Sequence, residues 1–240
     1  MTFKELFNGQ RPIIGIQDCG CTMQYSTYEK IQRDIDIFMK NGVIPLVKNV
    51  RGYVEDIKDA LAYLDDEYHG SVYGVSVPKH WDYAFHLAAE YNASFISIDE
   101  IDIMPEMEDG FWEKLSELKD AHKNIVVMGS MVYPRYSDLG FEGELNNVSS
   151  HCDAIIYMGD RADVTMMNGK IDEIKTVIKD FPVLMGEDFT EDQCLEGYLR
   201  GDGAVLDGWL KDHRSVLGNV YEPYVAEIAE ANRRQANNNT

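Results

Sequence analysis

Long apolar runs are missing from this chain of 240 residues, and their absence argues against a protein with membrane-spanning helices. No stretch approaches the roughly 20 consecutive apolar residues that a membrane-spanning helix needs. The first residues, MTFKELFNGQRP, have no apolar stretch behind a basic start, so they do not match a secretory signal. With 45% hydrophobic residues, the chain can still bury a substantial core. The sequence therefore predicts a folded, cytoplasmic protein.

Basic residues are scarce, because Lys and Arg total 22 against 42 Asp and Glu, a formal net charge of −20 at pH 7. A chain this negative repels nucleic-acid phosphates and anionic lipid, so we expect no nucleic-acid partner and no membrane surface. The simplest explanation of the acidity is a well-solvated surface. A small-molecule substrate is the partner that we expect. Association into a homo-oligomer is compatible with one sequence but leaves no signature in it.

Cysteine is rare too, with Cys19, Cys21, Cys152 and Cys194 spread too widely for a disulfide scaffold. In the fold predicted below, the first two follow a strand, the third precedes another strand, and the fourth lies in a helix. Four thiolates so placed cannot converge on zinc. We predict no metal site among them and no required cofactor, although carboxylates at the predicted site suit a hard divalent cation.

What the chain does have is a regular alternation of short β-rich runs and helical segments. The runs are apolar nearly throughout, which is typical of parallel strands covered on both faces. Eight such units, with no Gly-x-Gly-x-x-Gly loop after the first run, favour a closed (β/α)8 barrel, the TIM barrel, over an open doubly wound α/β sheet. We predict one barrel domain over 1–232 and a disordered polar tail over 233–240. The predicted strands cover 12–17, 43–47, 71–77, 94–98, 124–132, 153–159, 182–186 and 203–208. The predicted helices begin near Ser26 and cover about 54–64, 81–91, 110–121 and 171–178, with two more beginning at Thr190 and Glu222.

Ionisable side chains follow nearly every predicted strand. The active site of a (β/α)8 barrel lies at the C-terminal ends of its strands, so these side chains should meet in one polar pocket. With 27% charged residues, any single one could fall there by chance, and the convergence is the stronger evidence. The candidate catalytic residues are Asp18, Asp99, Glu187 and Asp207. The candidate substrate-binding residues are Lys48, Asn49, Lys79, His80, Glu100, Asp160, Asp188 and Trp209.

Several motifs occur in an order that resembles the BtpA/SgcQ family of (β/α)8 barrels. They include IIGI at 13–16, GVSV at 74–77, FPVLMG at 181–186 and DGAV at 202–205, within a likeness over about residues 12–230. The resemblance implies a barrel and, in different members, a nucleosidase-like or sugar-processing enzyme or a factor for photosystem I biogenesis. The chain departs from the family pattern after three strands. It has Asp18 where a His is expected, Glu187-Asp188 after Gly186 in place of Ser-Gly, and Asp207-Gly208 in place of Gly-Ser.

These departures place acid where many barrels bind phosphate, after the seventh and eighth strands. Glu187, Asp188 and Asp207 would repel a phosphate dianion there. Two carboxyl groups that flank a glycosidic bond are the minimal catalytic groups for its hydrolysis. We therefore predict cleavage of a glycosidic bond in an uncharged nucleoside or related sugar. Two alternatives stay open: a sugar aldolase or isomerase with Lys48 as Schiff-base amine, and a non-catalytic assembly factor on the same scaffold.

Overall fold

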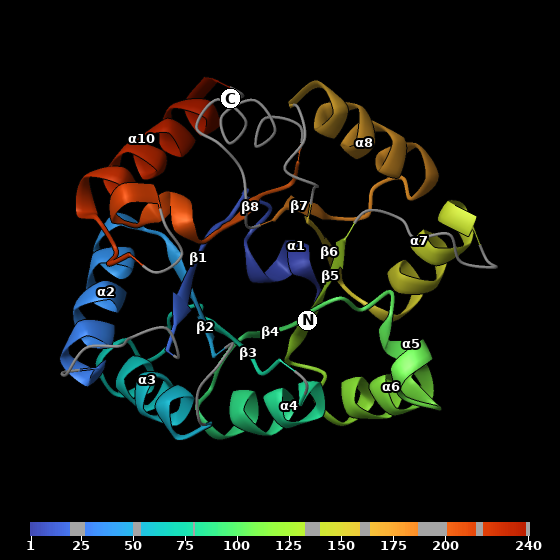
Figure 1. Ribbon diagram of the computed structural model, residues 1–240, viewed down its shortest axis with the longest axis horizontal. Helices are drawn as coiled ribbons and strands as arrows, with labels where there is room; N and C mark the ends of the chain where they lie inside the picture. The colour runs from blue at the N-terminus through green and yellow to red at the C-terminus, as the bar shows by residue number, and fades with distance from the viewer. Residues whose placement is uncertain are drawn as a thin grey trace.

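The computed structural model confirms the predicted TIM barrel (Figure 1). It describes residues 1–19, 27–49, 54–78, 80–132, 140–158, 164–186, 201–214 and 218–238. In this part of the chain, eight parallel strands pair in sequence order, and β8 pairs with β1 to close the barrel. The strands are β1 (Ile13–Asp18), β2 (Ile44–Lys48), β3 (Gly74–Ser76), β4 (Phe95–Ile98), β5 (Val126–Val132), β6 (Ala154–Met158), β7 (Val183–Met185) and β8 (Ala204–Leu206).

A ring of helices surrounds the strands in Figure 1. Apolar residues recur at helical spacing in the longer helices, so each of these buries one face against the sheet. The described helices of the ring are α2 (Thr27–Asn41), α3 (Val54–Glu67), α4 (Trp81–Glu90), α5 (Met104–Met107), α6 (Phe111–Ala121), α7 (Gly140–His151), α8 (Val164–Val177) and α10 (Glu222–Asn238). Two short 3-10 turns, η1 (Gly208–Leu210) and η2 (Asp212–Arg214), lie between β8 and α10.

Two segments differ from the sequence pattern. Helix α7 is regular, although the segment from 133 to 150 had the least regular pattern in the sequence. Helix α10 continues to Asn238 and includes most of the polar tail for which the sequence predicts disorder. Within that helix, Glu230 pairs with Arg233 at 3.2 Å and with Arg234 at 2.9 Å. The predicted helix starts at Ser26 and Thr190 lie outside the described residues.

The buried apolar side chains form two separate clusters, one on each side of the strand ring. Alternate residues of a strand point to opposite faces, so every strand except β3 contributes to both clusters, and β3 contributes Val75 to the outer one. The outer cluster packs the strands against the helices and includes Val47, Val75, Ile96 and Val127. The inner cluster fills the barrel interior with Ile14, Ile16, Leu46, Phe95, Val126, Met128, Ala154, Ile156, Leu184 and Val205.

Helix α1 (Phe3–Leu6) closes the N-terminal end of the barrel interior. Figure 1 shows it across the centre of the ring. A capping box holds its first turn, in which the Thr2 side chain accepts from the Glu5 N–H and Glu5 accepts from the Thr2 N–H. Its apolar side chains join the inner cluster, and the rings of Phe7 and Phe95 lie edge to face with centroids 6.2 Å apart. The interior is therefore packed from this end, which leaves the C-terminal ends of the strands for a site.

Candidate functional site

The two-residue alternation of the strands decides which side chains reach the C-terminal mouth of the interior. Two residues beyond the last inner apolar residue stands a polar one on five strands, and on β3 a polar residue stands two beyond the inner Gly74. We call this group the polar wall: Asp18 of β1, Lys48 of β2, Ser76 of β3, Ser97 with Asp99 of β4, Ser130 of β5, and Asp207 after β8. Its serines are at most 4% exposed, and the Ser76 Oγ has no hydrogen-bond partner within the described residues.

Lys48 and Asp99 form an ion pair across the polar wall. The Lys48 Nζ lies 3.1 Å from Asp99 Oδ2 and 3.3 Å from Oδ1. The lysine side chain is only 8% exposed and that of Asp99 is 26% exposed. Removing an ammonium from water is costly unless a carboxylate compensates it, so each residue of this pair requires the other. The sequence predicted both residues for the site but not their contact.

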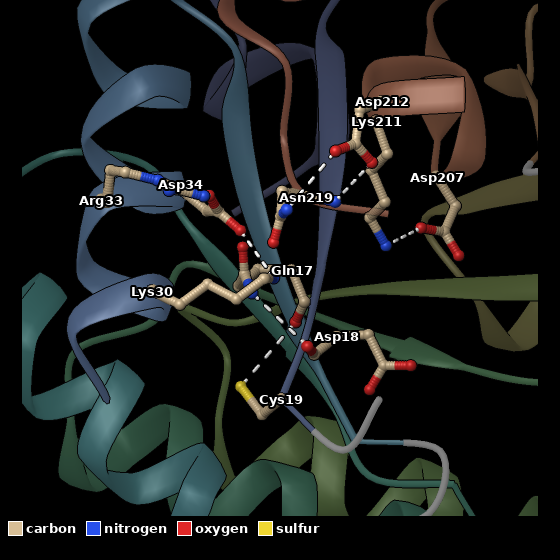
Figure 2. Close-up of polar contacts among 10 residues, drawn as sticks. All are labelled: Gln17, Asp18, Cys19, Lys30, Arg33, Asp34, Asp207, Lys211, Asp212 and Asn219. Atoms are coloured by element: carbon tan, nitrogen blue, oxygen red, sulfur yellow. Dashed lines mark hydrogen bonds and ion pairs between the residues drawn. The ribbon is translucent and has the colours of Figure 1, made fainter. Parts of the chain in front are cut away.

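Asp207 and Lys211 form a second ion pair, shown in Figure 2. Only 13% of the Asp207 side chain and 4% of the Lys211 side chain are exposed. Burial raises the pKa of Asp207, the charge and hydrogen bond of Lys211 oppose that shift, the Asp18 charge adds to it, and the Lys48 charge lowers it. Asp207 therefore lies within electrostatic reach of Lys211, Asp18 and Lys48. The protonated form of Asp207 is favoured relative to an ordinary aspartate.

The outer face of β1 carries a different set of polar groups. In Figure 2, Asp18 points to the side where Lys211 and Asp207 lie, while Cys19 points to the other side, toward α2. There Asp34 is fully buried and accepts bonds from Lys30 and Arg33 at 2.9 Å each. Cys19 itself is 1% exposed, and burial, with the Asp18 charge next, raises the pKa of its thiol. A thiol held in its neutral form is a poor nucleophile, so the first strand contributes its carboxylate to the mouth and its thiol to packing.

The remaining predicted residues lie in different surroundings, and some lie outside the described part of the chain. Asn49 is buried directly after β2. His80 is exposed at the start of α4, and Glu100 donates its backbone N–H to Ser130 Oγ at 3.0 Å. Trp209 is 6% exposed in η1, and the Arg214 guanidinium lies 3.5 Å from its ring centroid, so one ring face is already covered. Predicted residues that lie outside the described part of the chain are Lys79, Asp160, Glu187 and Asp188.

The three serines of the polar wall were missed as site residues. Serine is common and carries no charge, so it is not among the ionisable residues that indicate a site at the strand ends. The signal that would have found them is the alternation itself, since Ser97 follows Phe95 by two residues and Ser130 follows Met128 by two. Lys211 is likewise not among the candidate residues from the sequence. Its position four residues after Asp207 gives no indication of a buried contact.

The described residues contain no group of three or more His, Cys, Asp or Glu side chains placed to hold a metal ion. In the same ranges, no helix combines the length and the apolar character needed to cross a bilayer.

Comparison with known proteins identifies the fold alone. No family model matches the chain, and no curated protein sequence matches it. Solved structures do match over nearly its whole length. A protein from Aquifex aeolicus VF5 gives a TM-score of 0.69 at 13% identity, covering 97% of this chain and 96% of that one. The sialic acid aldolase of Ruminococcus gnavus, as a catalytic lysine mutant, gives 0.62 at 14%, covering 96% and 75%. The thiamine phosphate pyrophosphorylase of Pyrococcus furiosus gives 0.60 at 11%, covering 95% and 97%. The chain is thus similar to TIM-barrel proteins, and its resemblance to the BtpA/SgcQ family stays an expectation.

Proposed function

We propose that this protein is an enzyme that hydrolyses a glycosidic bond in a small uncharged nucleoside or related sugar. The observation that carries the proposal is the buried Asp207 at the mouth of the barrel. It is hydrogen-bonded to Lys211, and the charge of Asp18 contributes to its raised pKa. Two carboxylates in unequal surroundings are the arrangement that divides acid and base roles between them. A solved TIM barrel among those similar to this chain is a sialic acid aldolase, which supports sugar chemistry on this scaffold in general terms.

Asp207 is the proposed general acid. In its protonated form it gives its proton to the leaving atom of the substrate as the glycosidic bond breaks, and the bonding electrons depart with that atom. Lys211 donates a hydrogen bond to the other carboxyl oxygen and so fixes the orientation of the acid. The sugar carbon left behind carries positive charge, which the Asp18 carboxylate stabilises.

Asp18 is the proposed partner carboxylate. It either attacks the anomeric carbon or takes a proton from the water that does so. Lys48 and Asp99 present one donor group and one acceptor group as a pair, which suits the hydroxyl groups of a sugar. Glu187, a candidate from the sequence, stays a prediction for the same acid–base set. The two described lysines of the mouth are each paired with a carboxylate, so they add no net positive field for a phosphorylated substrate.

The test is hydrolysis of a panel of nucleosides and aryl glycosides by three variants. Asp18→Asn and Asp207→Asn should each lower kcat by a factor of 100 or more, because each removes an acid–base group. Asp120→Asn changes the same residue type at an exposed site on α6 and should leave kcat unchanged. Activity of Asp207→Asn at the wild-type level, or no turnover by the wild-type enzyme on the whole panel, would contradict the proposal.

The second candidate is a Schiff-base aldolase, favoured by one observation: Lys48 lies almost fully buried on an inner position of β2. Schiff-base formation requires a free neutral amine, whereas the Lys48 Nζ is engaged in an ion pair with Asp99, which counts against this candidate. Borohydride reduction in the presence of sugar aldehydes and ketones would separate the two. A stable mass increase in the wild-type protein that is absent from Lys48→Met would establish the aldolase and overturn the hydrolase.

A further inference from the structure

Among the described residues, the C-terminal strand ends of the barrel are polar on one side and apolar on the other. The polar wall covers β1 to β5 and β8. The two remaining strands, β6 and β7, present Met158 and Gly186 at the corresponding inner positions. We call these two residues the apolar corner. No charged or hydroxyl side chain stands at either position.

Met158 and Gly186 form one surface. A Cβ atom placed on Gly186 would lie 2.5 Å from the Met158 Sδ and 3.1 Å from a methyl group of Ile156, so the thioether lies over the space that a side chain of residue 186 would need. Met158 packs against the inner cluster from below and is only partly buried. A polarisable sulfur atom is a good contact for an aromatic ring.

The strand order relates this corner to the proposed acid. Because the strands pair in sequence order around the barrel, β7 is the direct neighbour of β8, which Asp207 follows, and β6 lies across the barrel from β2 with Lys48. The general acid of a glycosidase must reach the leaving atom. A leaving group protonated by Asp207 therefore has β7 and β6 beside it, while the sugar faces the polar wall.

We propose, on the basis of the proposed function, that the substrates are glycosides whose leaving group is a flat unsaturated ring, a nucleobase or another aromatic group, and that this ring binds on Met158 and Gly186. The sugar hydroxyls then meet the hydroxyls of Ser76 and Ser97 and the Lys48–Asp99 pair. The Ser76 Oγ is buried and has no hydrogen-bond partner in the described residues, so a sugar hydroxyl would supply the partner that it lacks. Glycosides with a small aliphatic leaving group would leave the apolar corner uncovered.

Binding of uncleavable C-glycosides tests this orientation without any need for hydrolysis. Phenyl C-riboside and methyl C-riboside differ only in the group that would contact the apolar corner, and titration calorimetry gives the Kd of each. The wild-type protein should bind the phenyl compound about tenfold more tightly, the size expected when a ring gains a sulfur contact and loses water. Met158→Ala should reduce this ratio to near one.

Two control variants show where an effect arises. Met107→Ala removes a methionine that is 71% exposed on α5, and it should preserve the ratio of the two affinities. Ser97→Ala removes a hydroxyl from the polar wall, and it should weaken both compounds by a similar factor, because both carry the same sugar. Circular dichroism of each variant confirms that it is folded.

The outcomes distinguish this inference from the proposed function. Equal affinity for both compounds in the wild-type protein, or an equal loss for both in Met158→Ala, overturns the orientation even if nucleosides are cleaved. Selective binding of the phenyl compound, lost in Met158→Ala, supports the apolar corner even if no glycoside is cleaved, in which case only the hydrolase proposal fails. Binding of neither compound overturns both.

Discussion

Replacing Gly74 by alanine tests the orientation of the strands on which the whole site depends. Gly74 points into the barrel interior, where an added Cβ would lie 2.2 Å from Cε2 of the Phe95 ring. Ordinary contact begins at 3.4 Å, so the ring would have to retreat by about 1.2 Å. Phe95 is fully buried and also packs on Phe7. Overpacking of this kind costs about 2–3 kcal/mol, so the free energy of unfolding should fall by that amount.

Urea unfolding followed by circular dichroism measures this free energy, and a double-mutant cycle identifies the cause. Phe95→Leu alone should cost about 1 kcal/mol, because it removes buried apolar volume. Together with Gly74→Ala it should cost less than the sum of the two single changes by about 1–2 kcal/mol, because the smaller side chain makes room for the methyl group. Gly169→Ala is the matched control: an added Cβ there meets nothing within 4 Å on helix α8, so we expect a gain of about 0.5–1 kcal/mol.

Two results would refute the reasoning. If Gly74→Ala costs less than about 0.5 kcal/mol, residue 74 does not face Phe95. If the cycle is additive, the cost does not arise from that contact. In either case Ser76, two residues further along β3, would not face the interior, and the polar wall and the apolar corner would both lose their basis in strand alternation.

The other predictions concern the mouth and the outer face of β1. Because burial raises the pKa of Asp207 above 3.8, the folded protein keeps this proton to a higher pH than the unfolded chain does, and the associated stability is lost as the pH rises from 3.8 through the raised value. Between acid and neutral pH, Asp207→Asn should therefore lose less unfolding free energy than the wild type. An equal loss in the two proteins would contradict this. In kinetics, Lys211→Met should move the alkaline limb of the pH–rate profile to higher pH, since Lys211 is the main influence that lowers the pKa of Asp207, and an unmoved limb would exclude Asp207 as the acid. Asp34→Asn should lower the free energy of unfolding, measured in urea, by about 2 kcal/mol, because a fully buried acceptor of charge-assisted bonds loses its charge, whereas a change below about 0.5 kcal/mol would show that its pairs contribute little. Thiol labelling with peptide mass mapping should leave Cys19 and Cys152 unmodified until urea unfolds the protein, since burial raises the pKa of Cys152 to about 12 and raises that of Cys19 as well; labelling in the native state would contradict their burial.

Much of this protein could be predicted from its sequence, because the information is local. Apolar runs separated by helical periodicity indicate parallel strands covered on both faces, and repetition of that unit indicates a closed barrel. The end of the barrel that carries the site follows from the fold class alone. Asp18, Lys48, Asp99 and Asp207 could be identified because each stands at or just beyond the end of a strand.

Only the tertiary structure decided how these residues combine. Lys48 and Asp99 are 51 positions apart, and their contact depends on the register in which the strands close the barrel, which no local pattern specifies. The same closure turns Asp18 inward and Cys19 outward, gathers the three serines beneath the charges, and, among the described residues, places Met158 and Gly186 at the inner ends of β6 and β7. Whether a strand-end residue reaches the mouth depends on strand alternation and register together: the sequence determined the first, and closing the ring of strands determined the second.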